Sequence, residues 1–415
     1  MIGEGKLFSI FLFLLTITCD SYAGEIIVGM NKQYKSISAA IAAAKSGDKI
    51  TILQGTYYEN NLVIDKRLYI SGINYPVIDG QYKKSIFLIR SSGTIIEGCE
   101  VRNAGQNNFD DYAGIKVENT HHVIVRNNKL VGNYFGIYFS QTIKCIAENN
   151  IVTAQQKLTE ISGNAIHCWK TDSCLVKNNT LSGCRDGIYF EFVTNSLIEN
   201  NYSHNNNRYG LHFMFSHHNK YVGNTFQDNG AGVAVMYTNH VEMYDNKFID
   251  NWGDAAYGLL LKEISDSHIS GNIFSNNTIG IVSEGASRII MEKNLFKNNG
   301  WAMRMQASCT GIQIDSNNFV SNTFDVGTNG SLVENKFANN YWDKYQGYDL
   351  NHDKIGDIPY RPVSLFSMMA ERDPIVLTLF RSLISMLIDQ AERFIPSLTP
   401  EDLKDDSPEL KPYQL

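Results

Sequence analysis

The stretch GLHFMFSHH, residues 210–218, combines apolar residues with side chains that can bind soft metal ions. Strand-like alternation places His212 and Met214 on one face, and the stretch GAGVAVMYT one repeat later carries Met236. Thioether and imidazole ligands suit copper(I). The sequence therefore predicts a transient copper(I) site at His212, Met214 and Met236, with His167 and His217 as further candidate ligands.

The same residues also fit roles that need no metal. The methionines could lie under a covering loop or form a docking patch for a partner. His217 and His218 fall at an expected turn, where solvated histidine is common. Met243 and Met291, by contrast, fall at inward positions of the repeat described next, and we expect them in the core.

The elements that position these residues come from a repeat. The pattern glycine-apolar-x-apolar recurs about every 22 residues, and asparagines keep the same interval. Each unit has room for short alternating segments and a polar turn, but not for a crossover helix. We therefore predict an all-β fold, a right-handed parallel β-helix over residues 24–342, with an N-terminal capping helix within Ser36–Lys45.

The repeat glycines define two outward columns, because alternate residues of a strand face opposite sides. Met214 and Met236 should therefore lie about 5 Å apart in adjacent coils. With Ala165 taken as the glycine equivalent in the longer coil, the column two residues on contains Tyr138, His167, Tyr189, His212, Ala234, Leu260, Val282 and Arg304. The column four residues after it contains Ser140, Trp169, Glu191, Met214, Met236, Lys262, Glu284 and Gln306.

The register of the glycines places Leu211, Phe213 and Phe215 in the core. Further inward columns are predicted by counting from the repeat asparagines. Three residues before each asparagine stand Ile124, Ile146, Leu175, Leu197, Tyr221, Met243, Ile269, Met291, Ile314 and Leu332. Two residues after it stand the aromatics Tyr202, Phe226, Phe248, Phe274, Phe296, Phe319 and Phe337, which should stack.

The N-terminus has the pattern of an export signal, predicted as residues 1–23. An apolar run from Leu7 to Thr18 follows Lys6 and is too short to span a bilayer. Cleavage after Ala23 is expected, and lipidation of Cys19 is the alternative. The expected location is the periplasm. The net charge of −7 argues against a nucleic-acid partner.

The cysteines that follow the signal have no spacing typical of a zinc site. Cys145 and Cys174 occupy equivalent places in successive coils, where a disulfide is geometrically possible. Export to an oxidising compartment would permit it.

Residues 343–415 follow the repeat. The sequence DLNHDKIGD could be a calcium loop or a turn built from Asx side chains. Pro374 should divide two helices, the second from about Ile375 to Ile395. Its apolar face should dock on a partner or the membrane surface, or pack on the last coil as a cap. Candidate docking residues are Phe366, Met368, Leu379, Leu383 and Leu387.

The phrases GLHFMFSHH, GAGVAVMYTNHVEM and PYRPVSLFSMM, with the coil repeat, resemble the NosD family. The resemblance implies a non-catalytic periplasmic protein that matures nitrous oxide reductase at its copper-sulfur centre. It also implies partners, namely that reductase, a copper chaperone and the membrane subunit of an ABC transporter in the inner membrane. The copper ligands named above do not come from the resemblance.

Two alternatives belong to other functional classes. A polysaccharide lyase or epimerase would need a base, an acid and a cation beside a uronate. His167, Tyr189, Glu191, His212 and Lys262 offer those residue types, but the methionine pair has no use there. A periplasmic adaptor without metal is the other alternative.

Overall fold

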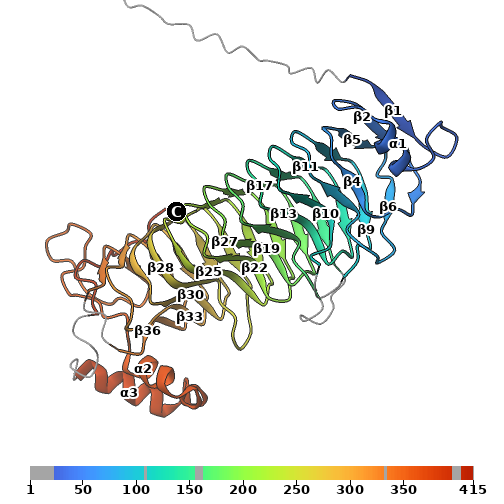
Figure 1. Cartoon of the computed structure of the whole chain (residues 1–415). Coiled ribbons are helices and arrows are strands. Elements are labelled where there is room, and N and C mark those ends of the chain that lie inside the picture. The colour runs from blue at the N-terminus through green and yellow to red at the C-terminus, as the bar shows by residue number, and fades with distance from the viewer. Residues whose placement is uncertain (1–22, 107–109, 155–161, 331–333, 395–402, 415) are drawn as a thin grey trace, which may run out of the picture.

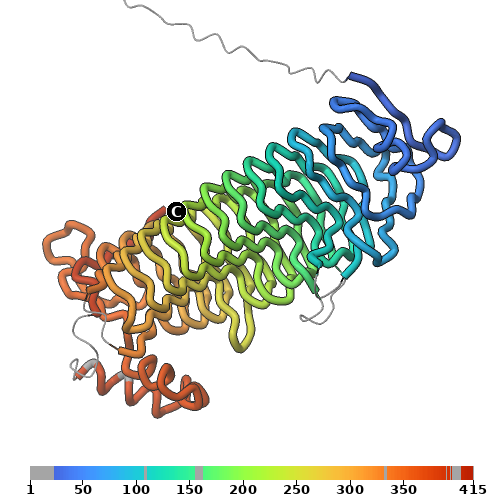
Figure 2. Tube along the Cα trace, in the orientation of Figure 1, coloured from blue at the N-terminus to red at the C-terminus, as the bar shows by residue number. Residues whose placement is uncertain are grey.

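In a computed structural model, the described residues are 23–106, 110–154, 162–330, 334–394 and 403–414. They form an elongated coil of short parallel strands with helices at its two ends (Figures 1 and 2). The predicted parallel β-helix is confirmed. Apart from Ala23, the predicted export signal lies outside the described residues.

Each coil contributes strands to three stacks, and each strand pairs with its copy in the next coil. β28 runs through the corner and belongs to the first and second stacks. The first stack contains β4 (Leu62–Ile64), β7 (Phe87–Ile89), β10 (Ala113–Glu118), β13 (Phe135–Ser140), β16 (Ile166–Trp169), β19 (Asp186–Glu191), β22 (Tyr209–Met214), β25 (Ala231–Asn239), β28 (Leu259–Ser270), β30 (Ile279–Glu284), β33 (Trp301–Met305) and β36 (Phe324–Thr328).

The second stack contains β1 (Glu25–Val28), β2 (Lys49–Ile52), β5 (Tyr69–Gly72), β8 (Ile95–Glu97), β11 (Ile124–Arg126), β14 (Ile146–Glu148), β17 (Leu175–Lys177), β20 (Leu197–Glu199), β23 (Lys220–Val222), β26 (Glu242–Tyr244), β31 (Ser287–Glu292), β34 (Gln313–Asp315) and β37 (Lys336–Ala338). The third contains β3 (Thr56–Tyr57), β6 (Val77–Asp79), β9 (Glu100–Arg102), β12 (Lys129–Val131), β15 (Ile151–Thr153), β18 (Thr180–Ser182), β21 (Tyr202–His204), β24 (Thr225–Gln227), β27 (Lys247–Ile249), β29 (Ile273–Ser275), β32 (Leu295–Lys297), β35 (Asn318–Val320) and β38 (Tyr341–Trp342).

A short helix covers the N-terminal end of the coil, as predicted. It is α1 (Ile37–Ala43), and the Ser36 hydroxyl caps it by accepting from Ala39 N–H at 3.3 Å. The Glu59 carboxylate accepts from the first two N–H groups of the helix, those of Ile37 and Ser38. The helix therefore buries Ile37, Ala40 and Ile41 over the open core.

The repeat glycines stand where adjacent coils approach each other closely. A Cβ atom on Gly210 would lie 2.8 Å from the Gly232 carbonyl oxygen and 2.8 Å from the Phe226 ring. A side chain there would push two coils apart. The glycines therefore mark the start of β10, β13, β19, β22, β25, β28 and β30, and with it the register of the outward columns. Ala165 and Ala302 take this place in β16 and β33.

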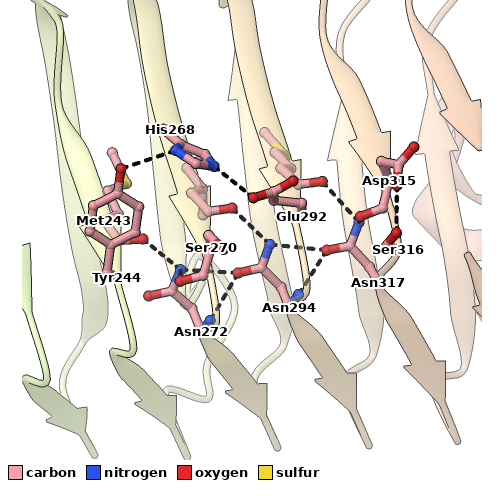
Figure 3. A network of polar contacts seen from close by, with 12 residues as sticks. Met243, Tyr244, His268, Ser270, Asn272, Glu292, Asn294, Asp315, Ser316 and Asn317 are labelled. Atoms are coloured by element: carbon pink, nitrogen blue, oxygen red, sulfur yellow. Dashed lines mark hydrogen bonds and ion pairs between the residues drawn. The ribbon is translucent and has the colours of Figure 1, made fainter. Parts of the chain in front are cut away.

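A ladder of buried asparagines runs along the corner that follows the second stack (Figure 3). Asn294 illustrates it, because its Oδ1 accepts from the backbone N–H and the amide of Asn272, both at 3.0 Å. Its own amide donates to Asn317 Oδ1 at 3.0 Å and to the Ile269 carbonyl oxygen at 3.0 Å. The ladder members are Asn128, Asn150, Asn179, Asn201, Asn224, Asn246, Asn272, Asn294, Asn317 and Asn340.

The predicted inward column is therefore partly wrong. Asn127, Asn149, Asn178 and Asn200 have a positive φ and turn the chain, while the next asparagine enters the ladder. Counting from the first member of each pair placed Ile124, Ile146, Leu175 and Leu197 in the core, but they are only half-buried. The buried residues are Val125, Ala147, Val176 and Ile198, which continue into the correctly predicted Tyr221, Met243, Ile269, Met291 and Ile314. Leu332 lies outside the described residues.

The aromatic column is confirmed over five coils. Phe248, Phe274, Phe296 and Phe319 stack with interplanar angles of 5–6°, and Phe226 packs on Phe248. Trp342 continues the stack at 4.0 Å from Phe319. Tyr202 is exposed because Ser203 occupies its expected place, and Phe337 is buried in the second stack opposite Ile314.

The six cysteines among the described residues are buried free thiols. Ile146 pairs with Leu175, so the preceding Cys145 and Cys174 are neighbours in adjacent coils as predicted. The predicted disulfide between them is not formed in this structure.

The C-terminal segment differs from the prediction. The expected long helix after Pro374 is instead a 3-10 helix, η2 (Pro374–Leu379), and a separate α3 (Leu383–Phe394). Arg381 has a φ of 61° and turns the chain between them. They follow α2 (Leu365–Arg372), whose Phe366 packs on Phe324 at the last coils.

The tail closes the C-terminal end of the coil, a role that the sequence had suggested only for a helix. Asp405 Oδ2 accepts from Asn340 N–H and the Asn340 amide, both at 3.0 Å, as a next ladder asparagine would. It also accepts from Trp342 Nε1–H at 3.0 Å. Tyr413 extends the contact by donating its hydroxyl to the Asn339 carbonyl oxygen. The tail therefore supplies a substitute for one further coil.

Candidate functional site

The candidate site lies on the outer face of the first stack, on β16, β19, β22 and β25. The predicted column two residues after the glycine is in register, since His167 pairs with Tyr189 and Tyr189 pairs with His212. The column four residues after it is in register too, since Met214 pairs with Met236. The strand arithmetic is therefore confirmed for both outward columns.

Met214 and Met236 form a pair of half-buried thioethers on adjacent strands. Glu191 precedes Met214 in the column and Lys262 follows Met236. The Tyr189 hydroxyl donates to Met214 Sδ at 3.8 Å. Two soft, uncharged thioethers on half-buried side chains are suited to copper(I).

His212 lies on the same face, but its ring nitrogen Nδ1 is hydrogen-bonded to an arginine. Arg208 Nη2 donates to His212 Nδ1 at 3.1 Å, so the proton of the neutral ring must be on Nε2. Burial lowers the pKa of His212 to about 3, with further contributions from Arg208 and Arg185. Neither ring nitrogen has a free lone pair for copper, and the neighbouring cations disfavour another one. The expectation that His212 completes the copper site is therefore not supported by its contacts.

The other two candidate histidines are placed apart from the sulfur pair. His167 packs among Phe135, Tyr138 and Tyr189, and its Nδ1 contacts the Asn164 amide at 3.2 Å. Burial, together with the nearby charge of Arg185, lowers the pKa of His167 to about 3. This ring is part of an aromatic layer.

His217 lies beyond the corner of the coil. Its Nδ1 accepts from Asn239 N–H at 3.2 Å, and its pKa is lowered by burial and by His218 and His240. His218 stacks on His240 at 4.6 Å. Across the described residues, no three His, Cys, Asp or Glu side chains converge to hold a metal ion.

A buried charged cluster beside the site was missed from sequence. Asp186 is fully buried, and its Oδ1 and Oδ2 lie 3.6 Å from Arg208 Nε and Arg185 Nε, respectively. Burial raises the pKa of Asp186, while the two arginines oppose that shift. All three residues stand just before a repeat glycine, where the strand alternation begins and the column analysis did not reach.

Exposed aromatic rings form a second feature that sequence reasoning missed. Phe215, expected in the core, has a φ of 50° and turns outward, where it is 37% exposed. It stacks on Phe192 at 5.4 Å and on Tyr237 at 5.2 Å. This aromatic strip, Phe192, Phe215 and Tyr237, directly follows the column of Met214 and Met236.

The candidate docking residues divide into two groups. Phe366 is 2% exposed and Met368 is packed against the core, so these two anchor α2 and are not available to a partner. Leu379, Leu383 and Leu387 are 37%, 72% and 56% exposed. Among the described helices, none is both long and apolar enough to cross a membrane.

The aspartate-rich segment contains Asx side chains that accept backbone N–H groups. Asp349 accepts from Asp353 N–H and Lys354 N–H, and Asp353 accepts from Ile355 N–H. Asp357 accepts from Leu350 N–H. These hydrogen bonds fit the alternative of a turn built from Asx side chains.

The comparison with protein families identifies the chain. The family described as "Periplasmic copper-binding protein (NosD)" matches residues 41–164 and 153–351. The chain belongs to the NosD family. The match spans the coil and includes the methionine pair and the charged cluster.

Curated relatives agree with this assignment. The chain is 28% identical over 381 residues to the "Probable ABC transporter binding protein NosD" of Pseudomonas aeruginosa, which covers 87% of this chain and 88% of the relative. The protein of the same name from Stutzerimonas stutzeri is 25% identical over 374 residues, 85% of each chain.

Solved structures share the fold. The Dettilon tailspike protein has a TM-score of 0.57 at 13% identity, over 72% of this chain and 65% of that one. The A-module of mannuronan C-5 epimerase AlgE4 from Azotobacter vinelandii has a TM-score of 0.53 at 17% identity, over 73% and 88%. At these identities the likeness concerns the β-helix alone.

Proposed function

We propose that this NosD-family chain is a periplasmic accessory protein that receives and hands over copper(I) during maturation of the copper-sulfur centre of nitrous oxide reductase. The observation that carries the proposal is the pair of half-buried methionines, Met214 and Met236, in register on adjacent strands. Both methionines lie within the part of the chain that matches a family described as copper-binding, which supports the proposal.

The ligand set suits transfer better than storage. Two thioethers leave copper(I) open to further ligands, and the contacts of His212 argue against its being one of them. A third ligand would then come from the partner that delivers or accepts the ion. The aromatic strip of Phe192, Phe215 and Tyr237 lies beside the pair and offers an exposed surface for such a copper chaperone.

The C-terminal helices would dock the protein on the membrane subunit of an ABC transporter in the inner membrane. Leu379, Leu383 and Leu387 leave an apolar surface on η2 and α3 exposed, and α2 holds these elements on the coil through Phe366 and the 2.5 Å contact between Arg304 and Glu371. The names of both curated relatives include "ABC transporter binding protein". They support a binding role over the carbohydrate-active alternative.

Copper binding is tested by competition for copper(I) with a chromogenic chelator. Met214→Leu combined with Met236→Leu keeps the volume and removes both sulfurs, so the affinity should fall at least about tenfold, a loss of about 1.4 kcal/mol. The matched control combines Met243→Leu and Met291→Leu, which removes two fully buried core sulfurs. Unchanged affinity in the first variant, or equal loss in both, would overturn the site.

Docking is tested separately by co-purification with the transporter membrane subunit. Leu383→Ser with Leu387→Ser should abolish it, because a polar side chain removes most of the apolar area each leucine buries. Ile73→Ser with Ile143→Ser is the control, since these residues are 43% and 51% exposed on the coil. Retention of the subunit by the first variant would argue against docking through α3.

A further inference from the structure

Four buried polar atoms without a hydrogen-bond partner in the described part of the chain belong to neighbouring residues beside the methionine pair. They are Arg185 Nε, Asp186 Oδ2, Arg208 Nε and His212 Nε2. Arg208 N–H donates to the Arg185 carbonyl oxygen at 2.9 Å, so the residues come from adjacent coils at the same corner. Buried polar groups are normally satisfied, and four exceptions in one cluster call for a physical cause.

The charges of the cluster do not balance internally. One carboxylate, Asp186, faces two guanidinium groups at 3.6 Å, beyond hydrogen-bond distance. His212 adds no negative charge, because it is a neutral ring whose Nδ1 accepts from Arg208. The cluster thus has an excess of positive charge and of donors, which is the complement of an anion.

Within the cluster, the two arginines reach solvent. The side chains of Asp186 and His212 are 0% and 4% exposed, whereas those of Arg185 and Arg208 are 29% and 38% exposed. Tyr209 and Tyr189 pack on the His212 ring, each at 4.9 Å. Arg208 lies over the Tyr209 ring at 4.4 Å, which holds its guanidinium in place. The arginines can therefore meet a ligand from solvent while their inner ends stay fixed.

We propose that Arg185 and Arg208 form a binding site for a small anion of carboxylate or oxyanion geometry. The guanidinium edges would bind two oxygen atoms, and His212 would position Arg208 through its Nδ1. The inference stands apart from copper binding, because none of its residues is a sulfur ligand. It bears on that function, since the Tyr189 ring contacts His212 while its hydroxyl reaches Met214 Sδ at 3.8 Å.

A bound anion would also change the electrostatics of the methionine pair. Without it, the excess guanidinium charge repels a copper(I) ion on the neighbouring column. With it, the local charge is neutralised. A free inorganic oxyanion and the carboxylate of a uronate sugar share the chemistry that the arginines recognise.

The test uses the unmodified full-length mature protein without copper. An arginine-specific dicarbonyl reagent is applied with and without sulfate, thiosulfate or an oligogalacturonate, and modified peptides are measured by mass spectrometry. We expect Arg185 and Arg208 to be protected by at least one probe at millimolar concentration, while Arg288, 63% exposed at its side chain, is not. Because this readout needs no variant, it does not depend on whether a substituted chain folds.

Calorimetric titration with the protecting probe then assigns the residues. Arg185→Gln and Arg208→Gln should each weaken binding about tenfold or more, the loss of one charge-assisted contact. Arg288→Gln removes the same charge elsewhere and should leave it unchanged. Protection by sulfate or thiosulfate indicates an inorganic ligand, and protection by the uronate alone indicates a sugar. No protection by any probe, or equal weakening by Arg288→Gln, overturns the site.

Discussion

The closure of the coil by its own tail can be tested at Asp405. Its Oδ2 accepts three hydrogen bonds of 3.0 Å, two from Asn340 and one from Trp342 Nε1–H. Asp405→Ala leaves Asn340 N–H and Trp342 Nε1–H without an acceptor, whereas the Asn340 amide still donates to the Ile314 carbonyl oxygen. Each orphaned donor costs about 1–3 kcal/mol, so local stability should fall by about 2–6 kcal/mol.

Native-state hydrogen exchange measures this loss where it occurs, on peptides that cover the last coil and residues 403–414. Asp406→Ala is the matched control, because this neighbour is exposed and pairs with Lys404 at the surface. It removes the same charge and should change stability by less than about 0.5 kcal/mol. Asp405→Asn, which keeps one oxygen, should lie between the two. Equal exchange in the Asp405→Ala and Asp406→Ala proteins would refute the cap.

Two further predictions concern the coil. The pKa of His167 is about 3 in the folded chain against about 6.5 when unfolded, so the unfolded chain binds one more proton between these values. His167 alone should lower stability by about 1.4 kcal/mol for each pH unit between pH 6.5 and about 3. Urea unfolding of His167→Asn should lose that contribution to the slope, and an unchanged slope would contradict the buried neutral ring. Asn246→Ala removes the partner of the Asn224 N–H and of the Tyr221 carbonyl oxygen, so the free energy of urea unfolding should fall by about 2–6 kcal/mol. Lys247→Ala, on the exposed side, should change it little. Similar losses in both variants would argue against the ladder.

The sequence predicted the outward columns correctly because the repeat glycine is unambiguous. Only a residue without a side chain fits the approach of Gly210 to the next coil. Counting from it therefore placed Met214 beside Met236. The asparagine pairs gave a weaker reference, since either member could be counted. A shift of one residue exchanges the two faces of a strand, so Leu197 and Ile198 changed places.

The environment of the site was less predictable than its register. His212 was correctly placed on the outward face, but Arg208 lies across a corner where the two-residue period does not apply. Phe215 was assigned by continuing that period one residue too far, into a left-handed turn. Position along a strand can be counted, whereas contacts across a corner depend on the packing of neighbouring coils.

The C-terminal cap could not be predicted from a periodic pattern. Asp405 takes the part of a ladder asparagine only once, and 65 residues separate it from Asn340. An acidic, proline-containing tail is compatible with many structures. The break at Arg381 is similarly local, because its left-handed φ ends η2 within an otherwise apolar run.

X-ray absorption at the copper edge tests the central claim most directly. In the copper(I)-loaded wild-type protein, two sulfur scatterers should surround the metal. They should disappear in Met214→Leu combined with Met236→Leu and persist in Met243→Leu combined with Met291→Leu. The comparison of variants also separates the methionine sulfurs from the six buried cysteine thiols. Sulfur scattering that survives loss of Met214 and Met236, or a purely nitrogen and oxygen environment in the wild type, would contradict a copper site at this pair.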